Sequence, residues 1–481
     1  MNEFEPEKVF HFFFEISKIP HGSGNTEALA EYCLNFAKER GLESYRDDYG
    51  NVMIFKDGTK GYEQSESVIL QGHLDMVCEK RLNYPKDMER EGIDIISDGE
   101  YLHADGTTLG GDDGIAVAYI LALLDDDGKI AHPPIEALLT SDEEVGLRGA
   151  HALDASRLKG KRLINIDSEE EGVLTVSCAG AVRVACAIPV SYEKTAAGIC
   201  AKKVTVRGLL GGHSGIDIGK GHRSAAIVLA EFLCELRKRY CVNIADLASG
   251  GRLNVISPTA NAVICFDRSQ AKEFESFLGE FNSWLKTACA ETEPDALVTA
   301  TDTEIPRECL NKACSDVVIS ALLLAPNGIS AISADIPFLV QTSSNLGSVS
   351  IEDGKLQLGF MIRSNTDYGK AETLQRLKCL MEQMGGEVEE SDDYPAWEYK
   401  RTSLLRDVMV HTYEKMYGEK PRICALHAGL ECGILSEKIE DADMVSIGPN
   451  MKNVHTPDEK LEIKSVQRCW EYLVLVLENL K

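Results

Sequence analysis

The sequence predicts an α/β protein in which a mostly parallel sheet is interrupted by an inserted α+β domain. Apolar runs of strand length alternate with helical patterns up to about residue 180, and this alternation returns after residue 402. The residues between these two parts follow a different order of helices and strands. At 481 residues, the chain is also longer than a single hydrophobic core usually grows, so we expect two or more domains.

The first part of the chain begins with helices and continues with strands. Residues 5–41 fit two amphipathic helices separated by the turn-forming "PHGSGNT". The runs "NVMIFK" and "SVILQGH" have strand length, and "GGDDGIAVAYILALLDD" passes from glycines into a helix that is apolar all along. The strand "PIEALLTSDEEVG", a helix near 147–155 and the strand "KRLINIDSEEEG" continue the alternation. We expect residues 1–180 and 402–481 to form one discontinuous catalytic domain.

Residues 181–401 follow the β-α-β-β-α-β order of a ferredoxin-like sandwich. The strands of a first series are "KKVTVRGLL", the pair "RLNVISPTANAVICFD", and "ALVTAT", and the pair "SSNLGSVSIEDGKLQLGFMIRS" belongs to a second series that ends in "GEVEE". The expected helices lie near residues 221–239, 271–288, 311–325 and 370–385. Arg-Ser follows the first strand pair directly and ends the second, so an internal duplication with a boundary near 290–310 and a generic strand-pair pattern both stay open.

The charge balance and the cysteines limit the class of protein. The 77 acidic and 50 basic residues give a formal net charge of -27, which argues against nucleic acid or an anionic membrane as the main partner. The 15 cysteines contain no C-x-x-C, so we expect neither a structural zinc site nor a disulfide framework. The start of the chain lacks the pattern of a signal peptide, and the longest apolar run, 115–124, is too short to cross a bilayer. We expect a cytoplasmic protein and leave homodimer formation open.

Histidine and acidic side chains follow several of the predicted strands. Because the carboxyl ends of parallel strands meet at one edge of a sheet, we expect these side chains to lie close together. Nitrogen and oxygen donors together suit a zinc-like ion, or two ions bridged by a carboxylate, better than magnesium or calcium. The candidate residues are His73, Asp112, Glu143, Glu144, Asp167 and His455.

The chemistry of a two-ion site suggests a role for individual residues. Two ions about 3.5–4 Å apart need a shared carboxylate, and Asp112 suits that position. Asp75 lies two residues after His73, so in an extended strand it faces the same side and can hold the imidazole N–H. Of the adjacent glutamates, one can bind metal while its neighbour removes a proton from water, and we expect Glu143 to be this general base.

Five motifs carry a resemblance to a known family. In their order and spacing, "GHLDMV", "LGGDDG", "SDEEVG", "INIDSEE" and "VHTPDE" resemble the two-zinc exopeptidases, which include aminoacylases, succinyl-diaminopimelate desuccinylases and bacterial dipeptidases. The "GGHSG" and "HAGLECG" stretches are similar to those of the aminoacyl-histidine dipeptidase branch. The resemblance extends over nearly the whole chain, and it implies an α/β catalytic domain with a smaller lid domain.

The resemblance also implies a set of metal ligands. The cofactor would be two divalent ions, most often Zn²⁺, with Co²⁺ or Mn²⁺ as alternatives. One ion would be held by His73, Asp112 and Asp167, and the other by Asp112, Glu144 and His455. The resemblance places Asp75 behind His73, assigns the base to Glu143, and implies a strained, often cis, peptide bond after Asp112.

Substrate contacts of the lid domain are likewise implied by the resemblance. His213 in "GGHSG" would reach the oxyanion, and Asn254 and Arg363 would hold the substrate's backbone and carboxylate. An arginine suits a carboxylate because its guanidinium can donate two parallel hydrogen bonds. Gly429 would lend backbone contacts, whereas we expect His427 to be structural.

These observations predict a zinc-dependent cytosolic dipeptidase that hydrolyses unblocked dipeptides, Xaa-His among them. An N-acyl amino acid deacylase or an aminotripeptidase on the same scaffold is the alternative within enzymes. A metal-binding protein without catalysis is the alternative from another class, and the presence of Glu143 with a full ligand set argues against it. The expected partner is a small peptide, with no nucleic acid and no membrane.

Overall fold

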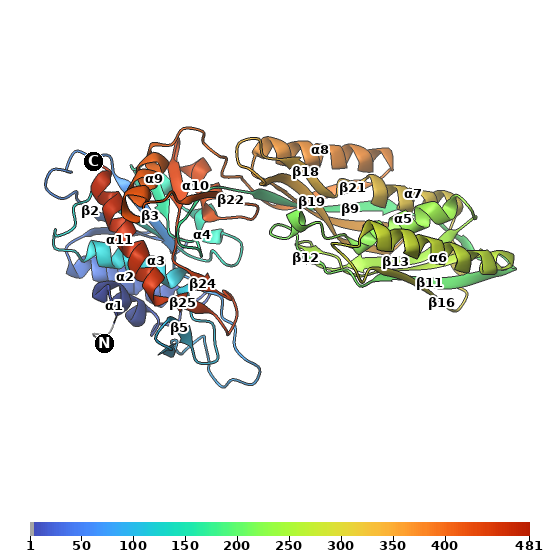
Figure 1. The fold of residues 1–481 in the computed structure, drawn as a ribbon, viewed down its shortest axis with the longest axis horizontal. Coiled ribbons are helices and arrows are strands. Elements are labelled where there is room, and N and C mark those ends of the chain that lie inside the picture. Colours follow the sequence, from blue (N-terminus) through green and yellow to red (C-terminus); the bar gives the residue numbers. More distant parts are fainter. Residues whose placement is uncertain (1–3) are drawn as a thin grey trace. The chain divides into compact units, whose positions relative to one another are not determined.

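The computed structural model describes residues 4–481, which divide into two compact units (Figure 1). Unit 1 comprises the chain up to Ser177 together with Tyr399–Ala425 and Leu430–Lys481. Unit 2 comprises Cys178–Glu398 and the short segment Leu426–Gly429. The chain therefore passes from unit 1 to unit 2 and back twice.

Unit 1 is built on a mixed eight-stranded sheet of order β1-β2-β6-β3-β7-β23-β8-β22. Its strands are β1 (Glu43–Arg46), β2 (Val52–Lys56), β3 (Val68–His73), β6 (Ile135–Thr140), β7 (Arg162–Asn165), β8 (Val173–Cys178), β22 (Arg422–Leu426) and β23 (Asp443–Ser446). The central strands β6, β3, β7 and β23 are parallel to one another. Strands β3 and β6 are buried along their whole length, as is typical of parallel strands covered on both faces.

Helices and a small antiparallel sheet complete unit 1. The helices are α1 (Glu7–Ile16), α2 (Glu27–Glu39), α3 (Gly111–Leu124), α4 (Arg148–Ala152), α9 (Leu404–Tyr417), α10 (Glu431–Lys438) and α11 (Ile463–Asn479). The small sheet contains β4 (Ile95–Ser97), β5 (Tyr101–Ala104), β24 (Met451–Lys452) and β25 (Lys460–Glu462). Helix α3 is buried along its whole length and packs against α1, because its residues are apolar on every side.

Unit 2 contains a nine-stranded sheet of order β16-β11-β15-β13-β19-β20-β9-β21, with β18 beside β19. Its strands are β9 (Gly180–Pro189), β11 (Ile199–Arg207), β13 (Asn243–Gly250), β15 (Ala260–Asp267), β16 (Leu297–Asp302), β18 (Gly328–Ile332), β19 (Val340–Glu352), β20 (Lys355–Ser364) and β21 (Glu387–Tyr394). Two short antiparallel pairs accompany it, namely β10 (Tyr192–Lys194) with β17 (Glu308–Leu310) and β12 (Gly212–His213) with β14 (Val255–Ile256).

Four helices cover one face of this sheet (Figure 1). They are α5 (Ala225–Arg237), α6 (Ala271–Ala288), α7 (Lys312–Leu324) and α8 (Asp367–Gln383). Alternate residues of the strands pack against the helices in one apolar core, as β9 shows with Val182, Val184, Cys186 and Ile188. Among residues 4–481, no helix is both long enough and apolar enough to cross a membrane.

The sheet of unit 2 contains two ferredoxin-like series joined edge to edge. The first series lies in the order β16-β11-β15-β13, and the second in the equivalent order β21-β9-β20-β19. Strand β13 pairs with β19, which makes the sheet continuous. Strand β9 begins the second series but precedes the whole of the first, so the first series is inserted between β9 and α7. The predicted α/β class with an inserted part of two ferredoxin-like units is confirmed.

Candidate active site

The parallel strands of unit 1 bring their carboxyl ends to one edge of the sheet. His73 is the last residue of β3 and pairs in register with Thr140, the last residue of β6. The turn after β6 carries the two adjacent glutamates, the first turn of α3 carries an aspartate, and the loop between β24 and β25 carries a histidine. Residues that meet at this edge are His73, Asp112, Glu143, Glu144, Asp167 and His455.

Each carboxylate oxygen of Asp112 faces one histidine. His73 Nε2 lies 3.1 Å from Asp112 Oδ1 and 3.8 Å from Asp167 Oδ1. His455 Nε2 lies 3.1 Å from Asp112 Oδ2 and 2.7 Å from Glu144 Oε1. Two ligand atoms about 2.1 Å from one tetrahedral ion lie roughly 3.4 Å apart, so both groups have the spacing of a metal site. The geometry suits two ions that share Asp112.

A buried carboxylate oxygen beside His455 favours a metal ion at this edge. Glu144 Oε1 is buried and has no hydrogen-bond partner among the described residues, although His455 Nε2 lies 2.7 Å away. The His455 nitrogen can itself bind a metal, so a cation between the two atoms would satisfy both of them. Glu143 and Glu144 also lie within ligand range of His73, so distance alone does not separate the roles of the two glutamates.

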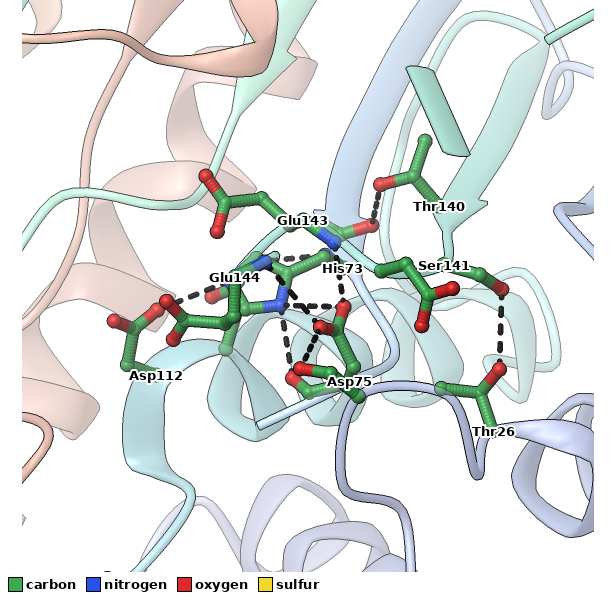
Figure 2. A network of polar contacts seen from close by, with 12 residues as sticks. Thr26, His73, Asp75, Asp112, Thr140, Ser141, Glu143 and Glu144 are labelled. Carbon is green, nitrogen blue, oxygen red and sulfur yellow. Dashed lines mark hydrogen bonds and ion pairs between the residues drawn. The ribbon is translucent and has the colours of Figure 1, made fainter. Parts of the chain in front are cut away.

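Asp75 organises the residues around His73 and the glutamate turn (Figure 2). The His73 Nδ1 atom lies 2.9 Å from the backbone carbonyl of Asp75 and 3.5 Å from its carboxylate, so the nearer partner is the carbonyl. The Asp75 carboxylate accepts hydrogen bonds from the backbone N–H of Glu143 at 2.9 Å and of Glu144 at 3.3 Å. It also accepts one from the Ser23 hydroxyl at 2.7 Å. Asp75 therefore orients the glutamate turn as well as the imidazole.

The charges at this edge shift one another's protonation. Burial lowers the pKa of His73, but hydrogen bonds to Asp112 and Asp75 outweigh it and hold the pKa well above its usual value. The carboxylates of Asp112 and Glu144 raise the pKa of His455 to about 10. Burial raises the pKa of Glu143 well above its usual value. Several carboxylates in one buried place favour bound positive charge, whether it is carried by protons or by metal ions.

The peptide bond between Asp112 and Asp113 is cis, as the resemblance implies. Asp113 is fully buried, and its Oδ2 accepts a hydrogen bond of 3.1 Å from the backbone N–H of His73. The turn that carries Asp112 is thereby attached to the end of β3.

The residues predicted to contact the substrate all belong to unit 2. His213 ends β12 and pairs in register with Val255, next to Asn254 in the chain. Asn254 is exposed, and its carbonyl accepts the backbone N–H of Ser214 at 2.9 Å. Its turn is fixed by the Asn345 amide, which donates to the carbonyls on both sides of it at 2.8 and 2.9 Å.

His213 is held in a single tautomer. Its Nδ1 accepts backbone N–H groups of Gly215 and Ile216, both at 3.2 Å, so in the neutral ring the proton is on Nε2. Burial lowers the pKa of His213, and the nearby charge of Arg363 lowers it further. The imidazole is therefore a neutral hydrogen-bond donor at Nε2.

Arg363 carries a buried charge without a carboxylate partner among the described residues. It is 6% exposed, its Nη1 lies 3.3 Å from the Tyr394 hydroxyl, and its Nε has no hydrogen-bond partner. A buried guanidinium is costly unless an anion pairs with it. Gly429 lies beside the same tyrosine, and a Cβ there would come within 2.9 Å of the Tyr394 ring. Arg363 is thus available to a ligand carboxylate.

The sequence reasoning missed the buried Glu431 and the hydrogen-bond partners of His427, which it expected to be structural. His427 has Nε2 2.8 Å from the Ser343 hydroxyl and Nδ1 3.1 Å from the Asn365 carbonyl oxygen. Glu431 is fully buried and accepts hydrogen bonds of 2.6 Å from Gln71 Nε2 and Thr140 Oγ1, while burial raises its pKa to about 7. Both residues belong to "HAGLECG", so the only sequence signal was the presence of this motif.

An α/β unit with two histidines and several carboxylates at one sheet edge defines a metal-dependent hydrolase as the class of protein. The profile of peptidase family M20/M25/M40 matches residues 69–479. The cytosol non-specific dipeptidase of Escherichia coli (strain K12) is 35% identical over 480 residues, which cover 100% of this chain and 99% of that protein. The chain belongs to peptidase family M20/M25/M40 and is a hydrolase of peptide bonds.

Solved structures agree with this membership. The aminoacylhistidine dipeptidase of Vibrio alginolyticus superimposes with a TM-score of 0.95 at 36% identity, covering 99% of this chain and 97% of that one. The aminopeptidase PepT of Bacillus cereus ATCC 10987 has a TM-score of 0.59 at 16% identity and 99% coverage of both chains, a likeness that extends to the fold alone. The predicted recognition of the family is confirmed.

Replacing His427 by Gln is expected to reduce the loss in free energy of unfolding that the protein shows when the pH falls from 7 to 5. Burial, together with the charge of Arg363, lowers the pKa of His427 from 6.5 to about 3. Between these values the unfolded chain binds a proton that the folded chain does not, so the free energy of unfolding falls as the pH falls. From pH 7 to pH 5 this loss is about 2 kcal/mol.

Urea unfolding at both pH values measures this difference for the parent chain and for His427→Gln. His411 is exposed, so His411→Gln serves as the control and should lose as much free energy of unfolding between pH 7 and pH 5 as the parent chain. Equal losses of stability in the parent chain and His427→Gln would contradict the expectation.

Proposed function

We propose that the chain is a dipeptidase whose two metal ions share Asp112. The observation that carries this proposal is the arrangement of that carboxylate, with one oxygen near His73 and Asp167 and the other near His455 and Glu144. Full-length relatives that are named dipeptidases support the substrate class. We further propose unit 1 as the catalytic domain and unit 2 as the lid domain.

The ions, which we propose to be Zn²⁺, would supply a water of lowered pKa and polarise the carbonyl of the peptide bond. Glu143 would accept the proton of that water and later deliver it to the leaving amine. Its position suits the task, because Asp75 fixes the backbone of Glu143 while Glu143 itself remains half-buried. Asp75 would also keep His73 oriented through the carbonyl contact at Nδ1.

Residues of unit 2 would bind the substrate. His213 offers an N–H at Nε2 that suits the developing oxyanion, because a fixed donor needs no reorganisation during the reaction. Arg363 would pair with the free carboxylate of the dipeptide through its buried guanidinium. Asn254 and the backbone at Gly429 would hold the peptide chain. A cytosolic location, as in the name of the E. coli relative, is part of the same proposal.

A substrate panel tests the proposed activity. Ala-His and β-Ala-His should be hydrolysed faster than N-acetyl amino acids or tripeptides, since a dipeptide has both a free amine and a carboxylate near the scissile bond. Chelation should abolish the activity, and added Zn²⁺ should restore it. A preference for N-acetyl amino acids would indicate a deacylase, and a preference for tripeptides would indicate an aminotripeptidase. Metal binding without any hydrolysis would indicate a metal-binding protein that lacks catalysis.

The variant Glu143→Gln is expected to bind both ions and to lose about 10²- to 10⁴-fold in kcat, because a general base contributes that factor. Elemental analysis gives the metal content, and initial rates with Ala-His give kcat. The exposed Glu440→Gln is the matched control and should keep both values. Full turnover by Glu143→Gln with its metal bound would show that the assigned base is wrong.

Replacing Arg363 by Ala is expected to raise KM for dipeptides about 10- to 100-fold, because a hydrogen bond to a charged group contributes roughly 1.5–3 kcal/mol. C-terminally amidated dipeptides, which lack the carboxylate, should be affected much less. Arg183 on the neighbouring strand β9 pairs with Asp392 at 2.9 Å, and Arg183→Ala is the control. Equal losses for free and amidated dipeptides would rule out a carboxylate partner for Arg363.

A further inference from the structure

The turn before Asp112 surrounds a carboxylate that belongs to none of the metal groups. Three successive backbone N–H groups donate to Glu459, from Leu109 to Oε2 at 2.8 Å, from Gly110 to Oε2 at 3.3 Å and from Gly111 to Oε1 at 2.8 Å. Gly110 has the left-handed conformation, with φ at 71°, that turns these N–H groups toward one point. Successive N–H groups in such a turn form a binding site for an anion.

The carboxylate that fills this turn comes from the segment of His455. Glu459 is 3% exposed, and its own N–H donates to the carbonyl of Thr456 at 3.1 Å. His455, by contrast, has a side chain that is 47% exposed and a backbone φ of 63°. Packing alone therefore holds His455 weakly, whereas Glu459 anchors its segment.

The fit between the two segments is close. A Cβ at Gly111 would lie 3.2 Å from Glu459 Oε1 and 3.3 Å from Met451 Sδ, so the carboxylate packs directly against the backbone of the turn. A carboxylate offers two acceptor oxygens to the three N–H groups. The neutral amide of glutamine would present an NH₂ group to one side of the turn and leave an N–H there without an acceptor.

We propose that Glu459 is a positioning residue that sets the distance between Asp112 and His455 and thereby the affinity of the ion they share with Glu144. The proposal rests on the metal centre of the proposed function. Glu459 connects the two segments that supply Asp112 Oδ2 and His455 Nε2, which lie 3.1 Å apart. His73 ends strand β3 and Asp167 follows strand β7, and among the described residues Glu459 makes no hydrogen bond to either strand.

A selective effect on one ion follows. In Glu459→Ala the ion of Asp112, Glu144 and His455 should bind at least 10-fold more weakly, while the ion of His73, Asp112 and Asp167 keeps its affinity within about threefold. Calorimetric titration of the metal-free full chain with Zn²⁺ should show two tight ions for the parent chain and one for the variant. The matched control is Asp458→Ala, whose exposed carboxylate pairs with Arg81.

Formate distinguishes positioning from a general loss of structure. It carries a single carboxylate that can occupy the space left by Glu459→Ala, so it should restore the second ion in a concentration-dependent way and leave Asp458→Ala unchanged. If Glu459→Ala does not fold, Glu459→Gln is used instead. This variant leaves no room for formate, and it should bind the ion of Asp112, Glu144 and His455 more weakly without a change in the affinity for the other ion.

Unchanged affinity for both ions, an equal loss of both, or a folded Glu459→Ala that formate does not rescue would overturn the proposal. These outcomes concern metal binding and do not depend on the substrate. Failure of the proposed function would appear differently, as a parent chain that binds no divalent ion or binds two and hydrolyses no dipeptide.

Discussion

Unit 1 depends on holding several carboxylates close together in a buried place. Asp112, Asp167, Glu143 and Glu144 would repel one another, and burial raises the pKa of Glu143 and of Asp167 well above the usual value. The two histidines between them offset this repulsion, and two further carboxylates fix the backbone that carries the ligands. The Asp75 carboxylate accepts hydrogen bonds from the backbone of the turn that carries the two glutamates. The Glu459 carboxylate accepts them from the backbone of the turn before Asp112. The site is therefore held as much by the main chain as by its ligand side chains.

The two units carry opposite kinds of chemistry. Unit 1 presents carboxylates with neutral or protonated imidazoles, which suits cations and a water that must lose a proton. Unit 2 presents a buried guanidinium and an imidazole with a fixed N–H donor, which suits negative charge. A peptide undergoing hydrolysis needs both, because its carbonyl oxygen and its terminal carboxylate are anionic while the attacking water requires a base. Under the proposed function, unit 1 would therefore serve the metal-bound water, and unit 2 would serve the anionic groups of the peptide.

Local patterns in the sequence were sufficient for most of the fold. The all-round apolar pattern of α3 and the buried runs of β3 and β6 are visible in the sequence because parallel strands and their covering helix need them. The residues at the strand ends could be gathered into one site because the direction of parallel strands dictates where those ends meet. The position of β9 in the second series could not be predicted, since a strand does not specify which distant partner it will pair with.

The contacts missed by the sequence reasoning share one physical origin. Glu431, Glu459 and His427 act through partners that lie far away in the chain, such as Gln71, Leu109 and Ser343. A glutamate within a polar motif looks like an exposed residue until its backbone partners are known. Only the tertiary structure distinguishes a carboxylate in water from one enclosed by main-chain N–H groups.

The early position of β9 has a consequence for how the chain acquires its structure. Its neighbours in the sheet are β20 and β21, so Gly180–Pro189 must wait for residues up to Tyr394 before both of its edges are paired. On the ribosome β9 is the first strand of the unit 2 sheet to emerge and among the last to have both edges paired, while the inserted series β11 to β16 can close by itself. Pairings so distant in sequence slow folding, because a long loop must close before they form. During synthesis, an apolar strand with open edges is thus exposed to solvent, where binding by a chaperone would protect it from aggregation.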